Sequence, residues 1–153
     1  MRKTGNKPKK QRKHFNPLAA MQPLPAEKVR ADMDRNLAAL AALATGTKAE
    51  VKEWDDLSDC VNTVEMLIEM GEIDQEHAAT SFEAIRAMRD SMHRHLNEGQ
   101  ALFMTEPEAQ AMRDLLTLYH VCLERKPWMI IYKAQQACTE RINAQLGQAR
   151  AAA

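Results

Sequence analysis

Residues 105–123 read TEPEAQAMRDLLTLYHVCL, and this stretch decides the fold class. It opens with a capping box, Thr105 followed three residues later by Glu108, and Pro107 stands in the first turn, where proline is tolerated. Apolar side chains then recur at spacings of three and four residues, at Met112, Leu115, Leu116, Tyr119, Cys122 and Leu123. The pattern predicts an amphipathic helix with one buried face.

The same periodicity predicts two helices earlier in the chain. The first begins at Pro25 and ends at Gly46, with its buried face at Val29, Met33, Leu37, Leu40 and Leu43. A capping box formed by Thr47 and Glu50 predicts the start of the second, which Gly71 ends. Its buried face comprises Val51, Trp54, Leu57, Val61, Val64 and Leu67.

Two further helices complete the pattern. We expect Asp74 to cap a helix that ends near Gly99, with one apolar face at Ala78, Phe82, Ile85, Met88, Met92 and Leu96. Pro127 either kinks the helix of residues 105–123 or starts a fifth one, with apolar positions at Ile131, Ala134, Cys138, Ile142 and Leu146. Residues 100–104 form a short apolar connector that we expect to pack against the helices.

Composition supports the same fold class. Two Trp, two Tyr, three Phe and five Gly are few for 153 residues, whereas Ala, Leu, Met and Glu, which favour helices, are abundant. Short loops between such helices favour antiparallel packing. The sequence therefore predicts an all-α protein, an antiparallel bundle of four to five helices. We expect a basic arm over residues 1–24, a helical domain over 25–148 and a disordered tail over 149–153.

The N-terminal arm carries a concentrated positive charge. Seven basic residues and no acidic one occur in residues 1–13, namely Arg2, Lys3, Lys7, Lys9, Lys10, Arg12 and Lys13. The whole chain has 21 Lys and Arg and 21 Asp and Glu, so the rest of it has 14 basic and 21 acidic residues, a net charge of −7. Such an arm suits the phosphate backbone of nucleic acid. If all seven charges contacted phosphates, a plot of the logarithm of the binding constant against the logarithm of the salt concentration would have a slope of about −6.

A second basic surface is predicted on the helix that precedes Gly99. Arg86, Arg89 and His93 are spaced three and four residues apart, so they share one helix face. We include Arg86 and Arg89 among the candidate nucleic-acid-binding residues. The alternative is an ordinary charged, solvated face.

The candidate catalytic and metal-binding groups do not form a convincing site. His93 and His95, like His120 and Cys122, stand two residues apart, which directs them to different sides of a helix. The carboxylates that follow Trp54 lie mostly opposite the apolar stripe, at Asp55, Asp56, Asp59, Glu65, Glu69 and Glu72. No phosphate-binding glycine loop, nucleophile elbow or HExxH motif occurs. We therefore predict a non-enzyme with no catalytic residues, metal or cofactor.

The expected compartment is the cytoplasm. Cys60, Cys122 and Cys138 are too few and too widely spaced for a secreted disulfide framework, and they lie on or near apolar stripes, as buried thiols do. Prolines at 17, 23 and 25 interrupt any signal-peptide core. No run approaches the ~18 apolar residues of a membrane span.

Three motifs resemble small helical proteins encoded by proteobacterial phages, prophages and plasmids. They are Glu53-Trp54-x-x-Leu57 followed by Asn62, Leu115-x-x-Leu118-Tyr119-His120, and the arm motif Asn6-Lys7-Pro8-Lys9-Lys10. The resemblance implies a helical body, a mobile-element setting and a bacterial host cell, and it supplies no catalytic residues. The segment Lys126-Pro127-Trp128 departs from what we expect of that group.

Three hypotheses about function follow. The first is a non-catalytic mobile-element protein that binds nucleic acid without sequence specificity through its basic arm. The second is an effector that binds and inhibits a host protein or defence complex through a charged surface. The third is a self-associating structural protein, in which the arm of one chain lies on the acidic body of the next. None of them involves a membrane or a small-molecule substrate.

Overall fold

The structure is a computed structural model that describes residues 16–46 and 49–153, which are entirely helical apart from their connections. The α-helices are α1 (Pro17–Ala20), α2 (Ala26–Thr45), α3 (Val51–Glu69), α4 (Ala78–Asn97), α5 (Glu106–Arg125) and α6 (Trp128–Ala152), and η1 (Gln75–His77) is a 3₁₀ turn. The predicted all-α class is confirmed. In the described part of the chain, no helix combines the length and the apolar character that crossing a bilayer requires.

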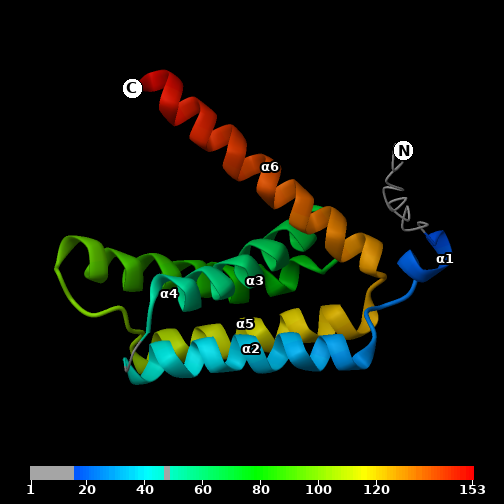
Figure 1. Cartoon of the computed structure of the whole chain (residues 1–153), viewed down its shortest axis with the longest axis horizontal. Coiled ribbons are helices and arrows are strands. Elements are labelled where there is room, and N and C mark those ends of the chain that lie inside the picture. Colours follow the sequence, from blue (N-terminus) through cyan, green and yellow to red (C-terminus); the bar gives the residue numbers. More distant parts are fainter. Residues whose placement is uncertain (1–15, 47–48) are drawn as a thin grey trace, which may run out of the picture.

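Four long helices surround a common core. Figure 1 shows α2 beside α5, with α3 and α4 on the other side of the core. α5 contacts α2, α3, α4 and α6, in keeping with its continuous apolar face, and α3 likewise contacts α2, α4, α5 and α6. The largest side chains that lose nearly all solvent contact come from α2, α3, α5 and α6, and include Leu43, Leu57, Leu67, Met112, Leu115, Leu116, Leu123 and Ile131.

Helix ends follow the capping signals, with one correction. The Thr105–Glu108 capping box opens α5 as predicted, and Gly46, with φ +65°, ends α2 in the left-handed conformation. The predicted box at Thr47 and Glu50 is wrong. Glu50 is itself the N-cap of α3, and its amide donates to the carboxylate of Glu53 at 2.8 Å. Thr47 lies outside the described residues.

The predicted inner face of α4 is wrong at both ends. Phe82 and Leu96 are 63% and 71% exposed. The fully buried positions are mostly small, at Ser81, Ala84, Ala87, Met88 and Ser91. Because α4 packs against both α3 and α5, its contact face is centred on these small residues, and the two ends of the predicted apolar stripe are turned toward solvent. The start of the helix also differs, since Asp74 precedes η1 and α4 begins at Ala78.

α2 departs from its predicted stripe at one position. Leu37 is exposed, whereas its neighbour Asn36 is completely buried. The Asn36 amide donates to Asp32 Oδ2 at 2.9 Å, one helical turn earlier. Periodicity alone favours the leucine, because it ranks residues by hydrophobicity and cannot detect a local polar partner.

α6 is a separate helix and not a continuation of α5. Pro127 is its N-cap, and the backbone amide of Trp128 donates to the Gln22 carbonyl at 2.9 Å, which ties the start of α6 to the segment after α1. Figure 1 shows α6 crossing the other helices and then extending away from them. Ile131 and Ala134 are buried, but Ile142 and Leu146 are exposed. Residues 149–152 are helical, where the sequence predicts a disordered tail.

Candidate functional site

An apolar groove lies between α3 and α4. It has a volume of about 440 Å³. α3 contributes Trp54, Ser58, Val61 and Asn62, and α4 contributes Ile85, Met88, Arg89, Met92, His93 and Asn97. The exposed side chains of Phe82 and Leu96 belong to the same face of α4, since they are three and four residues from Ile85 and Met92. The groove thus continues into further exposed apolar surface at each end of α4.

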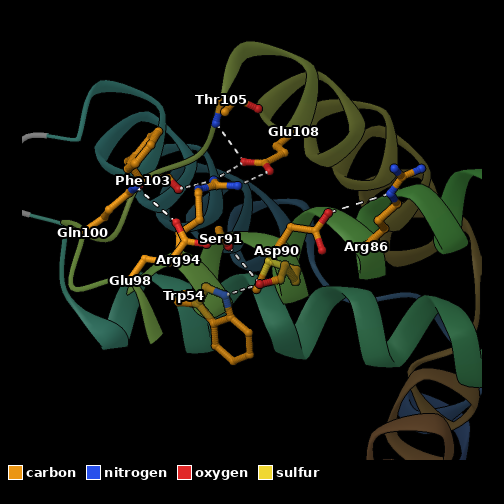
Figure 2. A network of polar contacts seen from close by, with 11 residues as sticks. Trp54, Arg86, Asp90, Ser91, Arg94, Glu98, Gln100, Phe103, Thr105 and Glu108 are labelled. Carbon is orange, nitrogen blue, oxygen red and sulfur yellow. Dashed lines mark hydrogen bonds and ion pairs between the residues drawn. The ribbon is translucent and has the colours of Figure 1, made fainter. Parts of the chain in front are cut away.

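Trp54 is held in place across the two helices. Its indole Nε1 donates to the backbone carbonyl of Met88 at 3.1 Å, and the Ser91 hydroxyl donates to the same carbonyl at 2.9 Å (Figure 2). A buried indole N–H requires such an acceptor, and this one links α3 to α4 directly. The aromatic part of the groove is therefore fixed before any ligand enters.

Arg89 lies at the α4 edge of the groove, whereas Arg86 lines a separate hollow between α4 and α5. Arg86 and Arg89 are exposed, and their Nε atoms lie 3.8 and 3.3 Å from the carboxylate of Asp90, which directly follows Arg89 in the sequence. Glu83 lines the same hollow as Arg86 and Asp90, so these two arginines and two carboxylates together carry no net charge.

A bidentate ion pair joins the C-terminal end of α4 to the start of α5. Arg94 donates to both carboxylate oxygens of Glu108, at 2.7 and 2.6 Å, and to the Phe103 carbonyl at 3.1 Å (Figure 2). The guanidinium carbon also lies 4.8 Å from the centre of the Phe103 ring. Glu108 additionally accepts from the Thr105 amide at 2.8 Å. One carboxylate therefore caps α5 and holds α4.

The electrostatics of this pair reflect its partial burial. Burial raises the pKa of the Glu108 carboxyl, but hydrogen bonds from Arg94 and from the Thr105 amide outweigh it and hold that pKa below its ordinary value. Hydrogen bonding to Glu108 raises the pKa of Arg94, against the opposite effect of burial. Both groups are charged at neutral pH.

The predicted nucleic-acid-binding residues fall into two sets. Arg86 and Arg89 lie together with His93 on one exposed face of α4, as their spacing predicts, but this face borders an apolar groove. The remaining set, Arg2, Lys3, Lys7, Lys9, Lys10, Arg12 and Lys13, lies outside the described residues. In the described part of the chain, the predicted basic surface therefore lies next to apolar side chains.

The cysteines are placed as packing residues. Cys60 and Cys122 are buried, and Cys138 is half-buried, with its thiol donating to the Asn62 carbonyl at 3.1 Å. Burial raises the pKa of all three thiols, which keeps them protonated at neutral pH. This protonation state is the opposite of what a thiolate nucleophile requires.

Histidines and carboxylates are dispersed in the described structure. His93 lies 3.7 Å from Glu98, and His95 Nδ1 lies 2.9 Å from the Gln100 carbonyl. In the described ranges, no three His, Cys, Asp or Glu side chains are grouped so that they could hold a metal ion. The predicted acidic face of α3 is largely solvated, although burial and then the charges of Asp55 and Asp56 raise the pKa of Asp59.

Sequence reasoning also missed two buried polar side chains. His120 is buried, and burial lowers its pKa, so the ring is neutral near pH 7. Within the described residues, its Nε2 and the Oδ1 of Asn36 are buried without a hydrogen-bond partner. The apolar periodicity did not identify Asn36 and His120 as buried, because each stands next to a larger apolar residue, Leu37 or Tyr119.

The groove was also not predicted as a site. The available signal was the pair of large apolar residues Phe82 and Leu96 in one stripe with Arg86, Arg89 and His93. Comparisons with protein-family models, with curated proteins and with solved structures gave no match for this chain. The candidate function therefore rests on the site alone.

Proposed function

We propose that this protein is a non-catalytic, cytoplasmic helical-bundle protein of a phage, prophage or plasmid, and that it acts by binding a partner protein of its host cell. The observation that supports the proposal is the groove between α3 and α4, where the half-buried side chains of Trp54, Ile85 and Met92 line an open apolar surface. Apolar surface of this kind is a common feature of protein interaction sites. Methionines such as Met88 and Met92 adapt their shape to a bound partner.

A capture experiment with matched variants tests this proposal. The full chain is immobilised and exposed to nuclease-treated bacterial lysate, in parallel with Met92→Glu in the groove and Leu146→Glu on the exposed end of α6. A protein captured by the wild type and by Leu146→Glu, but not by Met92→Glu, is then purified and its binding measured directly. Equal capture by all three proteins contradicts the proposal. Circular dichroism establishes that each variant is folded.

Nucleic-acid binding is the second candidate function. It is favoured by the separation of charge in the sequence, with seven basic residues in positions 1–13 and a net charge of −7 in the rest. Deleting residues 1–13 and titrating labelled DNA and RNA at two salt concentrations tests it. We expect the full chain to bind with a salt slope no steeper than about −6 and the deletion to abolish binding. Binding that survives the deletion contradicts this candidate.

A further inference from the structure

We draw no further inference here: the strongest candidate, the apolar groove between α3 and α4, carries none, because nothing in the structure shows what covers it.

Discussion

Replacing Glu108 with Gln tests the ion pair that holds α4 to α5. Gln retains a side-chain oxygen at the third position of α5, so it can still accept from the Thr105 amide and preserve the capping box. The substitution removes the negative charge that faces Arg94. The Arg94 guanidinium remains partly buried beside the Phe103 carbonyl and ring, and it loses its main partner.

The magnitude follows from the burial of the two side chains. Removing one partner of a fully buried ion pair costs about 3–5 kcal/mol, and exposed pairs contribute about 0–1 kcal/mol. The side chains of Arg94 and Glu108 are 19% and 13% exposed, between these limits. We expect Glu108→Gln to lower the free energy of unfolding by about 2 kcal/mol, between the buried and exposed cases. The corresponding decrease in Tm is about 4–8 °C for a chain of this size.

Urea unfolding at pH 7, followed by circular dichroism, measures this effect. Glu106→Gln is the matched control, because Glu106 is in the same helical turn and pairs with Arg113 at an exposed position. We expect the control to change stability by less than about 0.5 kcal/mol. If Glu108→Gln destabilises the protein no more than Glu106→Gln, the reasoning about the pair is refuted.

The same pair makes a pH-dependent contribution to stability. The pKa of Glu108 is lower in the folded protein than in the unfolded chain, so its stabilisation is complete above the unfolded pKa and is lost as pH falls through the folded pKa. The difference in stability between wild type and Glu108→Gln should therefore shrink in acid. A difference that stays constant from pH 7 to pH 3 would contradict this linkage.

Three further predictions concern other parts of the fold. Gly46→Ala should lower stability by about 1 kcal/mol in urea unfolding, because its φ of +65° is unfavourable for a residue with a Cβ. Leu115→Ala should cost about 2–5 kcal/mol in the same assay, since Leu115 of α5 is fully buried. In a thiol-labelling time course, Cys60 should react much more slowly than Cys138, because it is buried and its pKa is raised further. Equal labelling rates would contradict the last prediction.

The sequence predicts those elements whose signals are local. The capping box of Thr105 and Glu108 lies within one helical turn, and the apolar face of α5 is complete because other helices surround α5. Gly46 likewise marks a helix end through its own backbone conformation. The capping box and the glycine each involve residues close together in the sequence, and the apolar face is a repeat within a single helix, so the pattern contains the necessary information.

The sequence could not predict which side of α4 would be buried. Its apolar stripe includes Phe82 and Leu96, yet the contacts with α3 and α5 select a face of smaller residues. That choice depends on the distances between helices, which no single helix encodes. The groove has the same origin, because it exists where α6 does not cover α3 and α4. The spacing of Arg86, Arg89 and His93 was predicted correctly, but not the apolar surface beside them.

Interactions on both sides of the groove hold its walls in fixed positions. The hydrogen bond from Trp54 to the Met88 carbonyl fixes α3 relative to α4, and the ion pair between Arg94 and Glu108 fixes α4 relative to α5. Walls fixed in this way need little further ordering when a ligand binds, which reduces the entropic cost of association. Meanwhile, Arg141 pairs with Glu69 near the end of α3 and holds α6 there, away from Trp54. The fold thus keeps a rigid apolar surface open between α3 and α4.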